Sequence, residues 1–306
     1  MGKTLNVLIC DPISACAVGS LESHGYHVSV QDKITAEELL KAVPDYHVMV
    51  VRSRTKVKKE VVDAARSLRV VVRGGVGVDN IDVEYCLAKG IKVLNTPAAS
   101  SSSVAELTVS YIFALARPIV QATESLRAGK WEKSKFHGSE VQGKTLGIIG
   151  LGRIGMAVGQ RAAALGMVVH GFDTCAVGPA PFMMLVSLEE IYARSDFITV
   201  HVPLCEETHH MIDAAVFARL KDGVRIIDCA RGGVIDEEAL YEAIKSGKVA
   251  GAALDVLETE PPSSFKLFQL PQVIGSPHMG AMTAEATERI GGEVVDLLDR
   301  FYQESF

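Results

Sequence analysis

Short apolar runs rich in valine and isoleucine recur along the chain, and each leads into a stretch with helical spacing. Continuous apolar runs of this length predict strands covered on both faces, as in a parallel sheet flanked by helices. Four runs precede residue 100, at 6–10, 47–51, 69–73 and 91–94. Five more follow at 146–149, 167–170, 197–200, 224–227 and 250–254. The two series predict an α/β fold with two doubly wound parallel-sheet domains.

Two longer helical patterns stand between and after these series. Ser103 and Glu106 have the spacing of a capping box, which predicts a helix start at Ser103, and Pro118 should end or kink this helix. The pattern over 283–302 is amphipathic, but periodicity alone does not say which domain it packs on.

Length and composition fit this architecture. The 306 residues suggest two domains at about 150 residues each. A net charge of −6 gives no electrostatic reason to bind nucleic acid or an anionic membrane. No apolar run has the length of a membrane span, and Asp11 and Pro12 interrupt the N-terminal run too early for a signal peptide. We therefore expect a soluble cytoplasmic protein with a small-molecule substrate.

The cysteines and the histidine pair give no sign of a metal site. Six cysteines are scattered without a C-x-x-C pair, so neither a zinc site nor a disulfide framework is indicated, and we expect most of them in the core. His209 and His210 are adjacent, but neither their spacing nor a neighbouring cysteine supports a metal.

A glycine-rich turn carries the first chemical signal. A predicted strand runs directly into Gly150-x-Gly152-x-x-Gly155, and a helical pattern follows. In this arrangement the first glycine allows the tight turn, the second lets the backbone approach a pyrophosphate, and the third lets the helix pack on the strand. Alone, such glycines also make plain strand–helix turns.

Asp173 strengthens the dinucleotide interpretation. It ends the next predicted strand, 23 residues after Gly150, near the spacing expected for a carboxylate that binds ribose hydroxyls. Its negative charge would repel a 2′-phosphate, and Thr174 and Cys175 offer no cation, so we expect NAD rather than NADP. The alternative is a solvated aspartate at a strand end.

Three later segments place polar groups after predicted strands, where ligands of an open parallel sheet bind. They carry Arg231 within 227–233, Glu260 within 254–262 and His278 within 276–281. Singly, these residues could be a surface charge, a loop carboxylate and a polar core residue. Together they supply the cation, carboxylate and imidazole that suit proton-coupled hydride transfer.

The ordered motifs G-L-G-R-I-G, C-A-R-G-G, L-D-V-x-x-x-E-P and S-P-H-x-G-A resemble those of the D-isomer-specific 2-hydroxyacid dehydrogenases, over essentially the whole chain. The resemblance implies that Arg231 binds the substrate carboxylate and polarises the carbonyl, and that His278 is the acid–base group. It also implies that Glu260 orients the imidazole and favours its protonated form. Glu258 is nearer to Asp255 but does not precede the proline, so we assign this role to Glu260.

The resemblance further implies the cofactor contacts and the domain plan. A Rossmann NAD domain (99–282) would be inserted in a flavodoxin-like substrate-binding domain (1–98 plus 283–306), with dimerisation through the helices after Ser100. The implied cofactor residues are Val76, Gly150, Gly152, Arg153, Ile154, Gly155, Asp173, Val202, Pro203, Cys229, Ala230, Arg231, Asp255, His278, Gly280 and Ala281. Val76 and Val202 stand where close relatives often carry threonine, so they would offer only backbone or packing contacts.

Within the family, the segments 129–140 and 72–82 resemble the subgroup that oxidises 3-phospho-D-glycerate to 3-phosphohydroxypyruvate in serine biosynthesis. A doubly anionic substrate needs additional cations, which Arg52, Arg54 and Arg73 would supply beside Ser53. Backbone N–H groups around Val76 and Gly77 would bind the carboxylate. The alternative interpretation is that these arginines are solvated surface charges.

Two rival functions stay open. A glyoxylate or hydroxypyruvate reductase, or another D-2-hydroxyacid dehydrogenase, would not need the arginine pair Arg52 and Arg73. An NAD-sensing protein similar to the C-terminal-binding corepressors would retain the same three catalytic residues. Many relatives carry a C-terminal serine-sensing domain, whereas this sequence stops after its last predicted helix, so we expect no serine feedback through such a domain.

Overall fold

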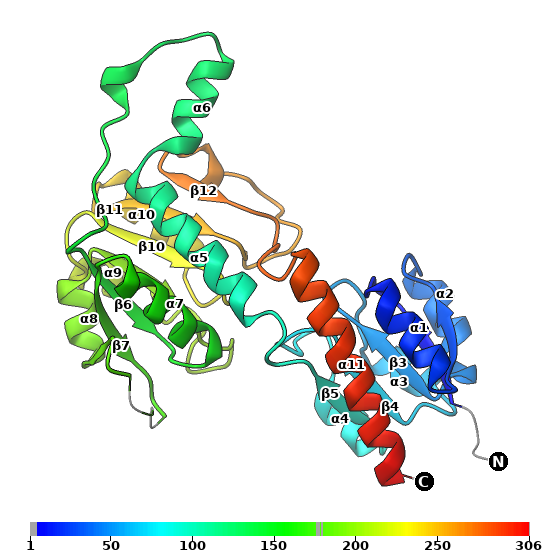
Figure 1. Ribbon diagram of the computed structural model, residues 1–306. Helices are drawn as coiled ribbons and strands as arrows, with labels where there is room; N and C mark the ends of the chain where they lie inside the picture. The colour runs from blue at the N-terminus through cyan, green and yellow to red at the C-terminus, as the bar shows by residue number, and fades with distance from the viewer. Residues whose placement is uncertain (1–4, 176–177, 179, 306) are drawn as a thin grey trace. The chain divides into compact units, whose positions relative to one another are not determined.

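A computed structural model of the chain describes residues 5–175, 178 and 180–305. The chain divides into two compact units, the first made of 1–100 and 281–306 and the second of 101–280. Each unit contains one fully parallel sheet with interleaved helices, which confirms the predicted α/β architecture (Figure 1).

The first unit is built on a five-stranded sheet in the order β2-β1-β3-β4-β5, the flavodoxin-like order. Its strands are β1 Asn6–Ile9, β2 His27–Val30, β3 Val48–Val51, β4 Val70–Arg73 and β5 Lys92–Asn95. Its helices are α1 Ala15–Ser23, α2 Ala36–Ala42, α3 Lys59–Ala64, α4 Val83–Ala88 and α11 Ala284–Ser305, and a 3-10 turn covers Val43–Asp45.

Alternate residues of the strands fill two cores on opposite faces of this sheet. Val7 and Ile9 belong to one apolar cluster, whereas Leu8 belongs to the other, as the two-residue period of a strand requires. The apolar stripe of α11, which includes Ile290 and Leu298, packs into the first cluster, and α11 lies beside α1 (Figure 1). The C-terminal helix is thus part of the first unit.

The second unit is built on a seven-stranded sheet in the order β12-β11-β10-β9-β6-β7-β8. Its strands are β6 Thr145–Ile149, β7 Val168–Phe172, β8 Met184–Leu185, β9 Phe197–Val200, β10 Val224–Asp228, β11 Val249–Leu254 and β12 Val273–Gly275. Its helices are α5 Ser101–Ala116, α6 Ile119–Arg127, α7 Arg153–Ala164, α8 Leu188–Arg194, α9 Ala214–Arg219 and α10 Glu237–Lys245. After β6, the strands β7 and β8 are added on one side, and β9 to β12 are added on the other side. The switch point between β6 and β9 is the position where Rossmann sheets bind dinucleotides.

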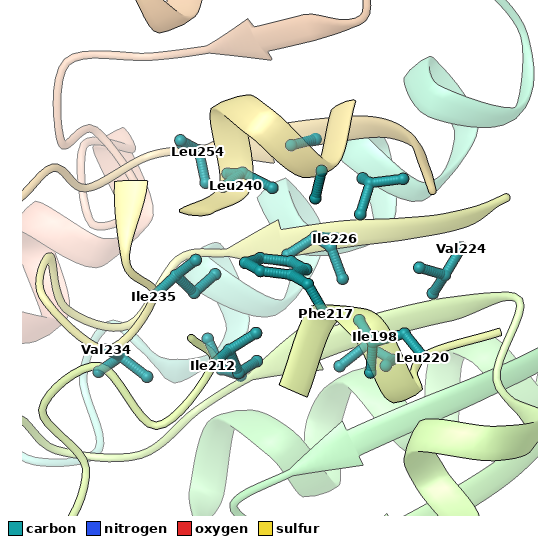
Figure 2. Packing of buried hydrophobic residues seen from close by; sticks show 14 of the residues in the cluster. Ile198, Ile212, Phe217, Leu220, Val224, Ile226, Val234, Ile235, Leu240 and Leu254 are labelled. Atoms are coloured by element: carbon teal, nitrogen blue, oxygen red, sulfur yellow. The ribbon is translucent and has the colours of Figure 1, made fainter. Parts of the chain in front are cut away.

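Apolar side chains under α9 and α10 make one face of this sheet rigid. Phe217 of α9 lies against β10, with Ile226 of that strand and Ile198 of β9 in the same cluster (Figure 2). These three side chains are buried almost completely, and each such burial contributes about 1.5–3 kcal/mol. The polar segments that follow β9, β10 and β11 therefore begin at the ends of well-packed strands.

The start of α5 differs from the prediction. The helix begins at Ser101, so Ser103 lies buried in its first turn and not at its N-cap. The Glu106 carboxylate accepts the hydroxyl of Ser102 at 3.1 Å. The predicted capping box is therefore wrong, because the four consecutive serines Ser100 to Ser103 offer several helix starts and packing selects among them. The predicted break at Pro118 is confirmed, since α6 begins just after it with a bend of 67°.

Three short strands and half of the cysteines also depart from expectation. The strands β2, β8 and β12 are not among the nine predicted runs. They lie at the sheet edges, and their alternating or very short apolar runs give only a weak sequence pattern. Cys10, Cys86 and Cys229 are buried, but Cys16, Cys175 and Cys205 are exposed, so the expectation that most cysteines lie in the core is wrong.

Two features are absent from the described residues, a single membrane-spanning helix and a metal-binding cluster. No single helix is long and apolar enough to cross a membrane, and the bent pair α5 and α6 passes that test by length and composition only. Within the same part of the chain, no group of three or more His, Cys, Asp or Glu side chains could hold a metal ion.

Candidate active site

The carboxyl edge of the second sheet gathers most of the residues singled out above. Because all its strands are parallel, the segments after β6, β7, β9, β10, β11 and β12 leave the sheet at one edge. These segments carry the glycine-rich turn, Asp173, Val202, Arg231, Glu260 and His278 in that order.

The glycine-rich turn has the shape that a pyrophosphate requires. Gly150 is in the left-handed region at φ 94°, and a Cβ on Gly155 would lie 2.0 Å from the carbonyl oxygen of Gly150. Gly152 caps α7 without any side-chain hydrogen bond, and a Cβ built there would meet nothing within 4 Å. The first N–H groups of α7 thus open onto clear space, so the turn fits the diphosphate of a dinucleotide.

Asp173 is tied to the same turn. One carboxylate oxygen accepts the N–H of Leu151 at 2.6 Å, and the other accepts the N–H of Cys175 at 2.8 Å. The carboxylate therefore stands at the end of β7 beside the glycines, where a ribose hydroxyl would reach it. On the other side of Gly150, His201 is held by Thr199 at 3.0 Å, and burial lowers the pKa of its imidazole to about 3.

The acid–base pair is formed by His278 and Glu260. Nδ1 of His278 lies 2.7 Å from Oε2 of Glu260, and the backbone N–H of Leu257 donates to the other carboxylate oxygen at 3.2 Å. With Nδ1 engaged, Nε2 is the imidazole nitrogen left for proton transfer. His278 has φ 52°, and its N–H donates to the carbonyl of Asp255 at 2.8 Å.

Arg231 completes the group electrostatically. Burial raises the pKa of Glu260, but the hydrogen bond and charge of His278, the Leu257 N–H and the charge of Arg231 together lower it below its ordinary value. The carboxylate is therefore ionised at neutral pH. The structure thus brings together the three residues expected to carry the chemistry.

The turn that carries His278 is held by a network that sequence reasoning missed in part. Asp255 is 2% exposed, and its carboxylate accepts the N–H groups of Met279 and Gly280, each at 2.8 Å. It also accepts the hydroxyl of Ser276, which in turn binds the hydroxyl of Tyr111. Ser276 stands in the S-P-H motif, whereas Tyr111 lies on α5, 165 residues earlier in the chain and outside every motif named above.

The remaining predicted cofactor residues differ in exposure. Cys229, Ala230, Asp255 and Gly280 are buried, whereas Gly152, Arg153 and Pro203 are exposed. Ile154 and Val202 are partly buried. Val76 and Ala281 belong to the first unit, and Val76 is exposed there with its carbonyl accepting the side-chain amide of Asn95 at 2.6 Å.

Two of the predicted substrate arginines border one glycine turn of the first unit. Arg73 ends β4, and Arg52 follows Val51 of β3, the residue that Arg73 pairs with across the sheet. A Cβ on Gly74 would lie 3.3 Å from Cγ of Arg52, and one on Gly75 would lie 1.4 Å from Nη1 of Arg73. Both arginine side chains therefore border this turn, with the backbone of Val76 and Gly77 next in the chain.

Arg54 is engaged differently. Its Nε binds the buried carboxylate of Asp11 at 2.9 Å, and its two other guanidinium nitrogens donate to the carbonyls of Cys10, Asp32 and Ile34. Because all three nitrogens have protein acceptors, this geometry speaks against the predicted phosphate contact by Arg54. Ser53, which lies between Arg52 and Arg54 in the sequence, is exposed.

Comparisons with known proteins agree with this geometry. Residues 109–280 match the family described as D-isomer specific 2-hydroxyacid dehydrogenase, NAD binding domain. The chain is 48% identical over 300 residues to a D-3-phosphoglycerate dehydrogenase of Methanocaldococcus jannaschii, covering 97% of this chain and 57% of that protein. It is 46% identical over 293 residues to a hydroxypyruvate reductase of Thermotoga maritima, covering 95% of this chain and 96% of that protein.

The fold is also that of solved relatives. The crystal structure of an NAD-dependent formate dehydrogenase from Staphylococcus aureus in complex with NAD superposes with a TM-score of 0.88 at 28% identity. The match covers 99% of this chain and 97% of that one. The chain spans little more than half the length of the M. jannaschii relative but nearly all of the T. maritima relative.

Proposed function

Because the chain belongs to the D-isomer-specific 2-hydroxyacid dehydrogenases, whose NAD-binding domain covers residues 109–280, we propose that it oxidises 3-phospho-D-glycerate to 3-phosphohydroxypyruvate. This reaction opens the phosphorylated route to serine. The observation that carries the chemistry is the pairing of His278 with Glu260 beside Arg231.

Each of the three residues has one task in this reaction. Nε2 of His278 takes the proton of the substrate hydroxyl as the carbon–oxygen double bond forms, and returns it in the reverse direction. Glu260 stabilises the imidazolium through Nδ1, and Arg231 binds the substrate carboxylate in a planar contact. Bound NAD supplies the acceptor for the hydride that leaves the same carbon.

The two arginines at the Gly74–Gly75 turn support a phosphorylated substrate. Burial lowers the pKa of the Arg52 guanidinium, while Asp11 raises it, so the positive charge sits in a partly desolvated position. An arginine there binds a phosphate more strongly than one in open water. We assign Arg52 and Arg73 to the phosphate, with the backbone around Val76 and Gly77 near the carboxylate.

The test is oxidation of NADH by the purified protein with 3-phosphohydroxypyruvate, hydroxypyruvate and glyoxylate in parallel. We expect kcat/KM to be at least about tenfold higher for the phosphorylated keto acid, which corresponds to about 1.4 kcal/mol of extra binding in the transition state. Equal or reversed preference would contradict the assignment of phosphoglycerate.

A second candidate is hydroxypyruvate reductase. The T. maritima relative of that name matches this chain over 96% of its own length, whereas the M. jannaschii phosphoglycerate dehydrogenase is matched over 57%. A preference for unphosphorylated hydroxypyruvate would favour this candidate. If the protein reduces no keto acid but still binds NADH, the NAD sensor would be favoured.

The cytoplasmic location expected from the sequence stays a prediction.

We also propose that the chain forms a homodimer through α6 and the loop after it. These project from the sheet of the second unit (Figure 1), and they expose Ile119, Leu126 and Trp131, the last at 84%. A second copy covering this surface would remove apolar area from water. Light scattering should show a dimer that Leu126→Glu dissociates, whereas Leu87→Glu on α4, an equally exposed leucine, leaves it intact. A monomeric wild-type protein would contradict the proposal.

A further inference from the structure

Two histidines of the described chain have an unusual backbone. Outside glycine, positive φ occurs among the described residues at His210 (49°) and His278 (52°). Such a conformation costs an L-residue about 1–2 kcal/mol, so contacts around each must hold it. Both imidazoles bind a carboxylate of the same short segment, residues 257–260. His278 binds Glu260, and His210 binds Glu258.

Glu258 is fixed from two sides. Its Oε1 lies 3.0 Å from Nε2 of His210 and accepts the N–H of Glu237 at 3.1 Å. The N–H of Glu258 donates back to the Glu237 carboxylate at 2.7 Å. The backbone two residues before Glu260 is thus held by a reciprocal pair and by an imidazole.

His210 itself stands on a rigid base. Its N–H donates to the carbonyl of Gly233 at 2.7 Å, and Ile212 forms a parallel bridge with Ile235. Ile212, Val234 and Ile235 are buried in the cluster that Figure 2 shows. The base therefore includes the segment that follows Arg231, so one histidine links the segments after β9, β10 and β11.

Carboxyl groups surround the imidazole of His210. Asp236 Oδ2 lies 3.8 Å from Nδ1, the His209 ring stacks at 4.0 Å, and Glu237 and Glu258 complete the surroundings. Burial raises the pKa of Glu237 and so does the charge of Glu258, whereas the Glu258 N–H and His210 lower it. Without the imidazole, Oε1 of Glu258 would lose one of its two hydrogen-bond partners and keep only the N–H of Glu237.

The segment has little freedom to adjust by other means. A Cβ on Gly232 would lie 1.9 Å from the carbonyl oxygen of Leu257, so the segments after β10 and β11 pack backbone to backbone. The position of Glu260 therefore depends on where its neighbours in 257–260 are held.

We propose that His210 and Glu258 are positioning residues, which fix the segment 257–260 so that Glu260 meets Nδ1 of His278. Neither residue touches substrate in this role. The kinetic part of the proposal rests on the proposed dehydrogenase function, whereas the structural part does not.

The variants are chosen so that the protein can still fold. His210→Gly removes the imidazole, and glycine adopts φ near 49° without strain, so the backbone of the segment can keep its conformation in the variant. Glu258→Ala removes the carboxylate, and Glu258→Gln keeps an oxygen that accepts the Glu237 N–H. The matched control is Glu238→Ala, a neighbouring glutamate that pairs with Lys266.

The first readout needs no turnover. In cofactor-free protein with ¹⁵N-labelled histidine, the Nδ1 resonance of His278 reports its hydrogen bond, and Glu260→Ala gives the position for complete loss. We expect His210→Gly and Glu258→Ala to shift this resonance toward that position. Glu258→Gln and Glu238→Ala should leave it near the wild-type value.

The second readout is kinetic, with the keto acid that the wild type reduces best. We expect kcat to fall about tenfold in His210→Gly and Glu258→Ala while KM for NADH changes less than about twofold, because only the alignment of the acid–base pair suffers. Glu258→Gln should recover most of the activity. An unshifted His278 resonance and an unchanged kcat in both variants would overturn the proposal. If the wild type reduces no keto acid, the proposed function fails, and the resonance still decides the positioning role.

Discussion

At the scale of single residues, the function depends on where protons and charges are held. Glu260 stays ionised because His278 and Arg231 outweigh the effect of its burial on its pKa. Asp228, three residues before Arg231, is buried at the end of β10 and behaves in the opposite way. Burial raises its pKa to about 8, although the N–H of Ala230 and the charge of Arg231 lower it. Near neutral pH, Glu260 is thus ionised and Asp228 is mostly protonated.

The acid–base role of His278 predicts a selective loss. In His278→Gln, kcat should fall about 10²–10⁴-fold, the usual contribution of a positioned general acid, while the Kd for NADH changes less than about twofold. Stopped-flow kinetics and fluorescence titration with NADH measure the two quantities. His24→Gln, which alters a surface histidine paired with Asp299, serves as the control and should change neither. Equal losses in turnover and NADH binding would contradict the role.

The raised pKa of Asp228 predicts a pH-dependent gain in stability. An unfolded chain loses this proton near pH 4, whereas the folded chain keeps it until about pH 8, so Asp228 lowers stability progressively as the pH rises between these values. An asparagine side chain at this position would still accept the Ala230 N–H without this penalty. Between pH 5 and pH 8 this penalty grows by about 4 kcal/mol, so in Asp228→Asn the melting temperature, relative to wild type, should be about 6 °C higher at pH 8.5 than at pH 5. Asp222→Asn, at a carboxylate that is 91% exposed, should show no such difference.

At the scale of elements, short turns at strand ends decide what each sheet can bind. The turn before α7 presents N–H groups to an anion because its N-cap is a glycine with open space around it. The turn after β12 holds His278 because the buried carboxylate of Asp255 binds its backbone N–H groups. In the first unit, the absence of side chains at Gly74 and Gly75 leaves room for the side chains of Arg52 and Arg73.

The open space above Gly152 predicts a binding defect without a folding defect. Its φ of −68° suits alanine, and an added Cβ would clash with no protein atom. Gly152→Ala should therefore leave the melting temperature unchanged and weaken NADH binding at least about tenfold, because the methyl group occupies the place of the pyrophosphate. Gly292→Ala in α11 also adds a methyl group in open space and should bind NADH as the wild type does. Normal NADH affinity in Gly152→Ala would contradict the cofactor assignment.

At the scale of the whole molecule, the proposed function assigns substrate choice and chemistry to different units. The second unit holds the family's NAD-binding domain and the His278, Glu260 and Arg231 group. The first unit holds the arginine pair proposed to bind the phosphate. The proposal therefore predicts that substitutions in the first unit alter selectivity among keto acids without altering the acid–base chemistry.

Arg52 tests this division. In Arg52→Gln, kcat/KM for 3-phosphohydroxypyruvate should fall about 10–100-fold, because a charged hydrogen bond to a phosphate contributes about 1.5–3 kcal/mol. The value for unphosphorylated hydroxypyruvate should change less than about threefold. Arg66→Gln removes an exposed arginine of the same unit that precedes β4 and should affect neither substrate. A parallel loss for both keto acids in Arg52→Gln would indicate a structural role for Arg52.

The sequence by itself determined the parallel sheets, the glycine turn and the dehydrogenase motifs, because each is written in residues close together along the chain. Buried strands must be apolar on both faces, and the turn before α7 requires glycine at Gly150 and Gly155 for steric reasons that hold locally. The sequence did not predict the edge strands β2 and β8, nor the start of α5 at Ser101. Their patterns fit several local structures, and packing chose one.

Only the tertiary structure decided which imidazole each carboxylate of the segment 257–260 meets. Glu258 and Glu260 are two residues apart and chemically alike, yet one binds His210 and the other His278. In the same way, Arg54 resembles Arg52 in sequence, but the buried carboxylate of Asp11 takes its guanidinium. Such pairings join residues far apart in the chain, so they depend on the packed segments between them and not on local sequence.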